Sequence, residues 1–186
     1  MRYILASKSP RRKELLGEII KDFKIVTREV DESLPEGIHP REGVEILAIR
    51  KGKAVAEKED MDFVVISSDT LVEIDGVALG KPCCRNHAIE MLRLLSGRAH
   101  NVHTGVAVHY DGKVLSGVAT TAVYFRELTD SEIEEYVDSG DPMDKAGSYG
   151  IQSGGGKFVE KIEGDYDTVV GLSVTLTKKL IDGITK

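Results

Sequence analysis

Apolar residues recur with one period in some segments of the chain and with a different period in others, and the two kinds of segment alternate. Continuously apolar or strictly alternating runs predict β-strands, whereas apolar residues spaced three or four apart predict amphipathic helices. The predicted strands cover residues 2–6, 24–30, 63–66 and 71–74. The predicted helices cover residues 10–20, 40–57, 86–95, 129–138 and 173–184. Strands that alternate with helices in this way indicate an α/β fold.

Two Asp-Gly pairs predict tight hairpin turns. Asp75-Gly76 follows the strand over residues 71–74, so residues 77–79 should return antiparallel. Asp111-Gly112 lies between the apolar residues 102–110 and the short run 113–115, which suggests a second hairpin. We therefore expect a mixed central sheet flanked by helices.

Two helix starts carry local signals. Ser9 followed by Pro10 is typical of an N-cap and a first helical residue. Thr129 and Glu132 have the spacing of a capping box. Between the last two predicted helices, the glycine-rich residues 147–156 predict a loop, and we expect this loop to lie near a ligand.

The composition is that of a soluble globular protein. The chain has 186 residues, of which 41% are hydrophobic and 30% are charged. A chain of this length can bury a core without disulfides, and we expect one domain over residues 1–186, built from two lobes. The N-terminal segment lacks the apolar stretch and cleavage site of a signal peptide, which favours the cytoplasm. Cys83 and Cys84 are adjacent and are expected to be reduced thiols.

The charge balance restricts the ligands. A net charge of −6 argues against broad contact with DNA or RNA, which requires a basic face. No apolar run approaches the roughly 20 residues of a membrane helix. A small anion needs only a local group of positive charges, and one such group is formed by Lys8, Arg11, Arg12 and Lys13.

The first candidate site is the turn from residue 6 to residue 12, between a strand and a helix. Backbone N–H groups at a helix start attract anions. Arg11 and Arg12 stand in the first turn, where positive charge opposes the helix dipole unless an anion is bound. The alternative is an ordinary capped helix with solvated arginines, and the turn alone does not decide between the two.

Acidic residues supply the second set of candidates. Asp69 follows the strongly apolar strand 63–66, so we expect it at the carboxyl end of that strand, where open α/β sheets place ligands. It could bind a metal or act as the general base that activates water. Glu32, in the pair Asp31-Glu32, could supply a second carboxylate, because magnesium binds one or two carboxylates in addition to water and phosphate oxygens. Alternatively, Asp69 is a turn or capping residue.

Two lysines complete the candidates. Lys51 has the helical phase of the apolar residues 44–55, so it should point partly inward and need an anionic partner. Lys81 ends the first predicted hairpin, which could return its ammonium group to the neighbourhood of Asp69. Lysine binds phosphate as a compact charge, although a lysine in such a place is commonly only solvated.

Several common motifs are absent. Around Lys157, Ile151 stands in place of the first glycine of a phosphate-binding loop and Phe158 in place of its Ser or Thr, and no dinucleotide-binding fingerprint follows a strand. His100 and His103 are three apart in a predicted strand, so they should point to opposite faces and not form a metal pair. No Gly-x-Ser-x-Gly elbow is present.

The sequence resembles the Maf-like nucleotide pyrophosphatases in blocks that cover most of the chain in family order. The blocks are LASKSPRRKELL at 5–16, LAIRK at 47–51, SSDTLV at 67–72, LGKP at 79–82, MLRLLSGRAHNVHTGVAV at 91–108, DKAGSYGIQ at 144–152 and GDYDTVVGL at 164–172. The resemblance implies a two-lobed mixed α/β fold with a cleft between the lobes, similar to that of the inosine-triphosphate pyrophosphatases and often dimeric. It implies cleavage of a nucleoside triphosphate to the monophosphate and pyrophosphate with Mg²⁺ or Mn²⁺.

The resemblance also assigns roles to residues. Asp69 resembles the general base or metal-bound carboxylate, and Glu32 resembles the second acidic group near the cation. The groups around the substrate are Ser7, Arg11, Arg12, Lys51, Thr70, Lys81 and Gln152. Gln152 resembles the branch that cleaves dTTP and UTP, since a neutral amide suits a pyrimidine edge.

Two alternatives remain open. The first is a pyrophosphatase with another base preference. The second is a non-catalytic regulator of septum formation, a role historically attached to this family. The acidic and basic candidates together count against a protein without catalysis, because a pure binding module needs no hydrolytic carboxylate.

Overall fold

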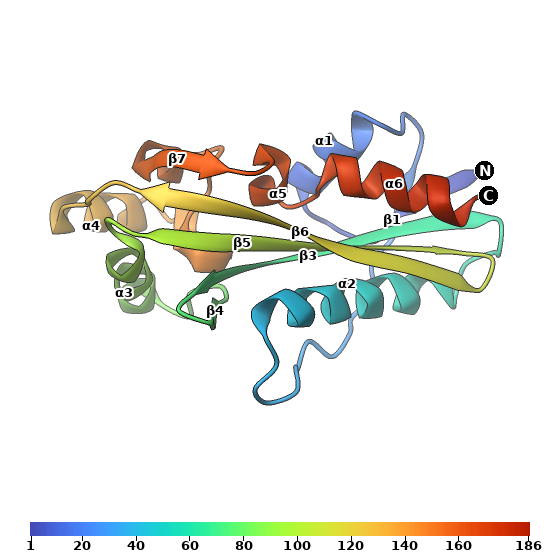
Figure 1. Cartoon of the computed structure of the whole chain (residues 1–186), viewed down its shortest axis with the longest axis horizontal. Helices are drawn as coiled ribbons and strands as arrows, with labels where there is room; N and C mark the ends of the chain where they lie inside the picture. Colours follow the sequence, from blue (N-terminus) through green and yellow to red (C-terminus); the bar gives the residue numbers. More distant parts are fainter. The chain divides into compact units, whose positions relative to one another are not determined.

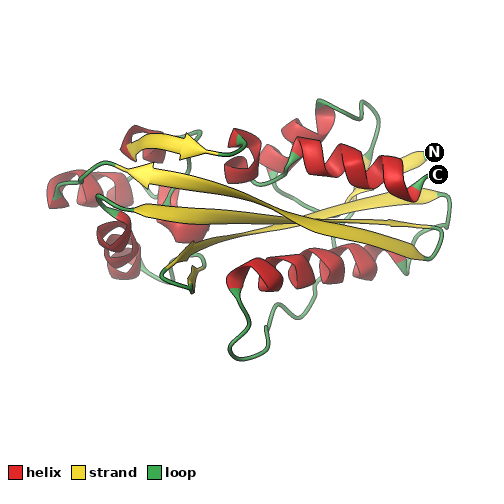
Figure 2. Ribbon diagram, in the orientation of Figure 1, coloured by secondary structure: helices red, strands yellow, loops and turns green.

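The structure is a computed structural model that describes residues 1–186. It contains a seven-stranded mixed sheet with the strand order β2-β1-β3-β5-β6-β7, and β4 pairs with β3. Helices flank this sheet (Figures 1 and 2). The prediction of a mixed α/β fold is therefore confirmed. No helix combines the length and the apolar character that are needed to cross a membrane.

The chain forms two compact units. The first contains residues 1–70, 104–119 and 171–186, and the second contains residues 71–103 and 120–170. The three long strands contribute residues to both units, and they are β3 (Phe63–Ile74), β5 (Ala99–Tyr110) and β6 (Lys113–Phe125). Two compact units agree with the expected two lobes, while the expected cleft stays a prediction.

The first unit is a three-layer arrangement. Its own elements are β1 (Arg2–Leu5), α1 (Pro10–Gly17), β2 (Lys24–Ile25), α2 (Pro40–Ala56) and α6 (Val174–Ile184). β1 lies between β2 and β3 and is parallel to both. Helices α1 and α6 lie on one side of the sheet and α2 lies on the other (Figure 1).

The second unit contains the antiparallel part of the sheet. Its elements are β4 (Val77–Leu79), α3 (Arg85–Leu95), α4 (Asp130–Asp138), β7 (Val159–Glu163), α5 (Tyr166–Val170) and 3₁₀ turns at Asp141–Asp144, Ala146–Ser148 and Gly154–Phe158. β4 is antiparallel to β3, and β7 is antiparallel to β6. Edge-on ring contacts join Phe125 to Tyr149 and Phe158, and Leu92 and Ile133 are fully buried in the same core.

Close packing seats α2 against the sheet of the first unit. A Cβ atom on Gly105 of β5 would lie 2.5 Å from the carbonyl oxygen of Val44. A Cβ atom on Gly52 of α2 would lie 2.5 Å from Oγ of Ser67 and from Cδ2 of His109. Only glycine leaves room for the helix and the strands to approach so closely, and this approach brings the side chain of Lys51 to the sheet.

The predicted turns and helix starts are confirmed. Asp75 and Gly76 have φ angles of 54° and 78°, as expected for a tight hairpin turn. The Oγ of Ser9 caps α1, and Pro10 is its first residue. Thr129 and Glu132 form both bonds of the capping box of α4.

The predicted strand over residues 24–30 is wrong for most of its length. Only Lys24 and Ile25 pair with β1. The Val26 amide still donates to the carbonyl of Leu5, after which β1 has ended and offers no further backbone partner. The alternating pattern was therefore not sufficient, because a strand also needs a neighbour of matching length.

Candidate functional site

Asp69 lies inside a continuous strand. The predicted end of the strand at Ser67–Thr70 is wrong, because β3 continues from Phe63 to Ile74. The hydroxyl of Ser67 donates to the carbonyl of Ala48 at 2.7 Å, and the hydroxyl of Ser68 donates to the carbonyl of Gly171 at 2.9 Å. Because both buried hydroxyls are hydrogen bonded, the polar residues do not interrupt the strand. Asp69 therefore has strand residues both before and after it in the sequence and does not lie at a strand end.

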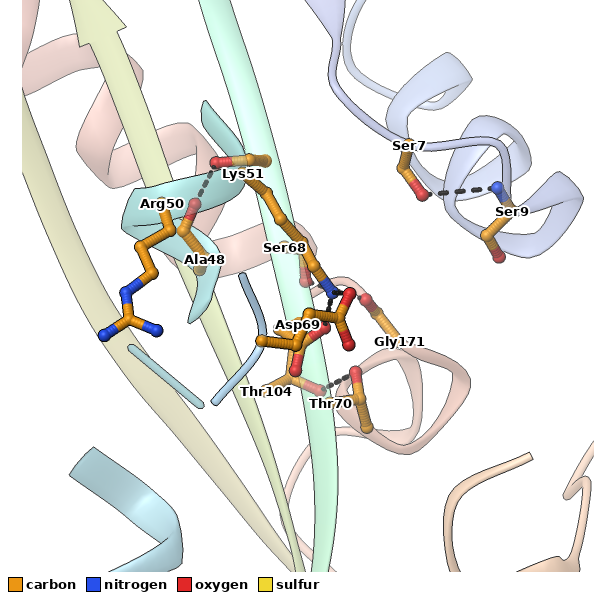
Figure 3. Close-up of polar contacts among 12 residues, drawn as sticks. Ser7, Ser9, Ala48, Arg50, Lys51, Ser68, Asp69, Thr70, Thr104 and Gly171 are labelled. Atoms are coloured by element: carbon orange, nitrogen blue, oxygen red, sulfur yellow. Dashed lines mark hydrogen bonds and ion pairs between the residues drawn. The ribbon is translucent and has the colours of Figure 1, made fainter. Parts of the chain in front are cut away.

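Lys51 links the two candidate carboxylates. Its Nζ atom contacts Oδ1 of Asp69 and lies 3.0 Å from Oε1 of Glu32. The side chains of Lys51 and Asp69 are 20% and 12% exposed, so each charge needs the other. The prediction that Lys51 points inward to an anion is confirmed. Figure 3 shows its side chain ending at the Asp69 carboxylate.

Arg50 fixes the loop that carries Glu32. Its Nη1 atom donates to the carbonyls of Asp31 at 3.1 Å and of Ser33 at 2.5 Å, which are the two neighbours of Glu32. Hydrogen bonds from the hydroxyl and backbone of Ser33 lower the pKa of the Asp31 carboxyl group. The Arg50 side chain extends away from Asp69 (Figure 3). Its contribution was missed from the sequence, although it directly precedes Lys51.

The turn after β1 brings Ser7 and Arg12 into one hydrogen-bonded group. Nη1 of Arg12 donates to Oγ of Ser7 at 3.4 Å, and the Ser9 amide donates to the same oxygen at 3.2 Å. Ser7 Oγ therefore accepts two bonds, and its O–H proton is still available to an acceptor. The alternative of solvated first-turn arginines is wrong for Arg12, because its guanidinium is hydrogen bonded to protein oxygens, although both Arg11 and Arg12 are partly exposed.

The charge of Arg12 interacts with the carboxylates of Asp69 and Glu32. Burial lowers the pKa of the Arg12 guanidinium, the charge of Asp69 opposes this shift, Arg11 adds to it and Glu32 opposes it. Arginine nevertheless remains charged in proteins. The first unit therefore gathers Arg12, Lys51, Asp69 and Glu32 within reach of each other's charge.

Thr70 is occupied by other protein groups. Its Oγ1 atom accepts from Nη2 of Arg12 at 3.3 Å and lies 2.9 Å from Oγ1 of Thr104. Thr104 is fully buried on β5 and was not singled out from the sequence. Gly171 was also missed, and its carbonyl accepts from Nε of Arg12 at 2.8 Å.

Lys81 and Gln152 belong to the second unit, where both are exposed. Their assignment to the substrate stays a prediction. The loop around Gln152 is held by Asp141, whose Oδ2 atom accepts from the hydroxyls of Tyr136 at 2.6 Å and Ser153 at 2.5 Å. Lys145 donates to the other oxygen of Asp141 at 3.0 Å. The predicted loop over residues 147–156 contains two short 3₁₀ turns and is internally braced.

The histidines and cysteines have other surroundings. His100 Nε2 lies 2.8 Å from the hydroxyl of Tyr149, whereas His103 contacts Glu73 at 3.0 Å and Thr120 at 2.8 Å. Cys83 and Cys84 are free and exposed. No group of three or more His, Cys, Asp or Glu side chains could hold a metal ion. A cation would therefore have to bind with fewer protein ligands, as magnesium does.

Comparison with known proteins decides the family. The family model described as "Maf-like protein" matches residues 2–184. The chain belongs to this family. The Maf-like chain is 50% identical over 179 residues to a dTTP/UTP pyrophosphatase of Thermococcus onnurineus, with 95% of each chain covered. It is 48% identical over 171 residues to a dTTP/UTP pyrophosphatase of Bacillus cereus, with 92% of this chain and 89% of the relative covered.

A solved structure supports the fold alone. The Ham1 protein of Staphylococcus aureus is similar with a TM-score of 0.50 and 16% sequence identity, over 67% of this Maf-like chain and 72% of that chain.

Proposed function

We propose that this Maf-like protein is a nucleoside triphosphate pyrophosphatase that hydrolyses dTTP and UTP, and modified pyrimidine nucleotides, to the monophosphate and pyrophosphate. Relatives with this name match over nearly the whole chain. The observation that carries the proposal is the largely buried carboxylate of Asp69, which contacts Lys51 beside the partly buried guanidinium of Arg12. A carboxylate next to such cations fits hydrolysis of a polyanion better than simple anion binding, which gains nothing from a buried negative charge.

Asp69 serves as the general base in this proposal. It takes a proton from a water molecule, the water oxygen attacks the α-phosphorus, and the bond from that phosphorus to the bridging oxygen of the β-phosphate breaks. Pyrophosphate is the leaving group. Because phosphoryl transfer depends mostly on positioning and charge neutralisation, the surrounding cations are as necessary as the base.

Cations and hydroxyls bind the phosphates. Lys51 and Arg12 neutralise charge, and the free O–H of Ser7 donates to a phosphate oxygen. Arg11 and Lys81 add positive charge, following the family resemblance. Together these groups hold the triphosphate in line for attack.

The proposed cofactor is a divalent cation, Mg²⁺ or Mn²⁺. Glu32 and Asp69 both contact the single ammonium group of Lys51, so two carboxylates converge, which fits the one or two carboxylates that a magnesium ion takes. They would hold the ion, which supplies charge neutralisation to the phosphates when it is bound.

Gln152 is proposed to recognise the pyrimidine base. Its amide offers both a donor and an acceptor, which match the N3–H and carbonyl groups shared by thymine and uracil. Hydrogen bonds from Tyr136 and Ser153 to Asp141 hold the loop around Gln152. We also propose that the protein acts in the cytoplasm as a homodimer.

The test is pyrophosphate release from a panel of nucleoside triphosphates with magnesium or manganese. We expect dTTP and UTP to be the best substrates. A clear preference for guanine or inosine nucleotides would refute the assignment of the base alone. If no triphosphate is cleaved, the catalytic proposal fails and a regulatory protein becomes the better description.

Asp69→Asn should abolish release while the protein stays folded and binds nucleotide. Glu32 lies 3.0 Å from Lys51 in the wild type, so the ammonium should keep one anionic partner in this variant. The matched control is Asp22→Asn, which alters an exposed aspartate. Full activity of Asp69→Asn would remove Asp69 from the role of base.

A further inference from the structure

We propose that Ser68, Thr104 and the carbonyl of Gly171 are positioning residues that fix the guanidinium of Arg12 for the triphosphate. The inference rests on the proposed function, in which Arg12 binds phosphate. These three residues lie in three sequence blocks far apart along the chain, and none of them was assigned a role by the family resemblance.

Arg12 is held by three different protein oxygens. Nε donates to the carbonyl of Gly171 at 2.8 Å, Nη1 to Oγ of Ser7 at 3.4 Å and Nη2 to Oγ1 of Thr70 at 3.3 Å. None of these acceptors is a carboxylate. The protein therefore orients the guanidinium without a direct ion pair to a carboxylate, which leaves its remaining N–H groups for a bound anion.

The number of donors on Arg12 leaves N–H groups for a bound anion. A guanidinium has five N–H groups, and three of those on Arg12 are used by Gly171, Ser7 and Thr70. The two that remain are on Nη1 and Nη2, one on each nitrogen. Both can donate to the oxygens of a phosphate group.

A second layer of buried hydroxyls supports two of the three acceptors. The hydroxyl of Ser68 donates to the Gly171 carbonyl at 2.9 Å, so this oxygen is fixed by two donors. Oγ1 of Thr104 lies 2.9 Å from Oγ1 of Thr70. Ser68 and Thr104 have no exposed surface, and Figure 3 shows Thr104 pointing to Thr70. Neither can touch the substrate, so each acts through its neighbour.

The backbone conformation at residue 171 favours glycine. Its φ angle is 130°, a conformation that residues with a side chain rarely adopt. A Cβ atom there would lie 3.5 Å from Nε of Arg12 and 3.6 Å from Oγ1 of Thr70. Glycine therefore allows the backbone carbonyl to face Arg12 at hydrogen-bonding distance.

The test compares Thr104→Val with Thr104→Ser. Valine keeps the shape of threonine and removes the hydroxyl, while serine restores it. We expect Thr104→Val to raise KM for dTTP and for UTP by the same factor, about fivefold to tenfold, with little change in kcat. Thr104→Ser should return KM to within about twofold of the wild type. Ser68→Ala should act in the same direction as Thr104→Val.

The matched control is Thr177→Val. Thr177 is another fully buried threonine of the first unit, and its hydroxyl donates to the carbonyl of Ser173 at 2.6 Å within α6. This variant should lose stability and keep the wild-type KM. If Thr104→Val behaves like Thr177→Val, the hydroxyl is merely structural and the proposal is overturned.

A double variant shows whether the effect passes through Arg12. In an Arg12→Lys background, Thr104→Val should raise KM by less than about twofold further, because the oriented guanidinium is already gone. A full additional factor would refute the coupling.

Binding of inorganic pyrophosphate, measured by calorimetry, separates this proposal from the proposed function. The wild type should bind it about fivefold to tenfold more tightly than Thr104→Val. Equal affinity overturns the positioning role even if dTTP is cleaved. If the wild type cleaves no triphosphate but shows this difference in affinity, the proposed enzymatic function is refuted and the proposed positioning of Arg12 is retained.

Discussion

Gly52→Ala tests whether the seating of α2 holds Lys51 at Asp69. The added Cβ atom would lie 2.5 Å from Oγ of Ser67, and 2.5 and 2.6 Å from Cδ2 and Nε2 of His109. These neighbours cannot move freely. Ser67 donates to the carbonyl of Ala48 at 2.7 Å, and His109 is buried and hydrogen bonded to the backbone of Ile49. Both bonds join the sheet to α2, so moving the helix outward weakens them.

The expected magnitude follows from these contacts. Overpacking of a buried site costs about 1–3 kcal/mol. We expect a value of about 3 kcal/mol because the added Cβ atom would overlap two hydrogen-bonded side chains, Ser67 and His109. Replacing a helical glycine by alanine returns about 1 kcal/mol. The net loss is about 2 kcal/mol, which lowers Tm by about 4–8 °C for a chain of this length. Because a displacement of about 1 Å at a reacting group can cost about a hundredfold in rate, kcat should fall strongly as well.

The assay combines thermal unfolding with pyrophosphate release. Gly17→Ala in α1 is the matched control, since a Cβ atom there has nothing within 4 Å. This control should gain about 0.5 kcal/mol and keep its activity. If Gly52→Ala is as stable and as active as Gly17→Ala, the close approach of α2 to the sheet does not position Lys51.

Two further predictions concern other parts of the molecule. Burial lowers the pKa of His100 to about 4, below its ordinary value of 6.5, so stability should fall as the pH drops from about 6.5 towards 4, by about 3 kcal/mol in full. His100→Gln should flatten this slope in urea unfolding between pH 7 and pH 4.5, and an unchanged slope would assign it to other groups. Arg50→Gln frees the loop around Glu32, so the magnesium concentration at half-maximal pyrophosphate release should rise about tenfold, with a small effect at saturation. Arg41→Gln, which alters an exposed arginine on the same helix, should leave the half-maximal magnesium concentration and the activity at saturation unchanged.

Local signals predicted most elements of the fold. The Asp-Gly turns, the Ser9 cap and the Thr129 capping box act within a few residues, so their outcome does not depend on the rest of the chain. The prediction of a strand over residues 24–30 was wrong because the length of that strand depends on β1, which is a distant partner in sequence.

The candidate site was predicted less completely. The helical phase of Lys51 correctly indicated an inward side chain with an anionic partner. The position of Asp69 was wrong, because Ser67 and Ser68 look like the polar end of a strand until their buried acceptors, Ala48 and Gly171, are known. Thr104 and Gly171 gave no chemical signal in the sequence, since their contacts with Thr70 and Arg12 form only in the folded chain.

The place of Asp69 within an uninterrupted strand has a consequence for how such a protein can be altered. A side chain on a strand bonded to its neighbours cannot be moved by changing a nearby loop, so the position of the Asp69 carboxylate tolerates few insertions around residue 69. The segment around Gln152 consists of short turns held by side-chain bonds, and such segments accept exchange more readily. If Gln152 recognises the base as proposed, grafting residues 147–156 while the strand is retained should change the nucleobase preference.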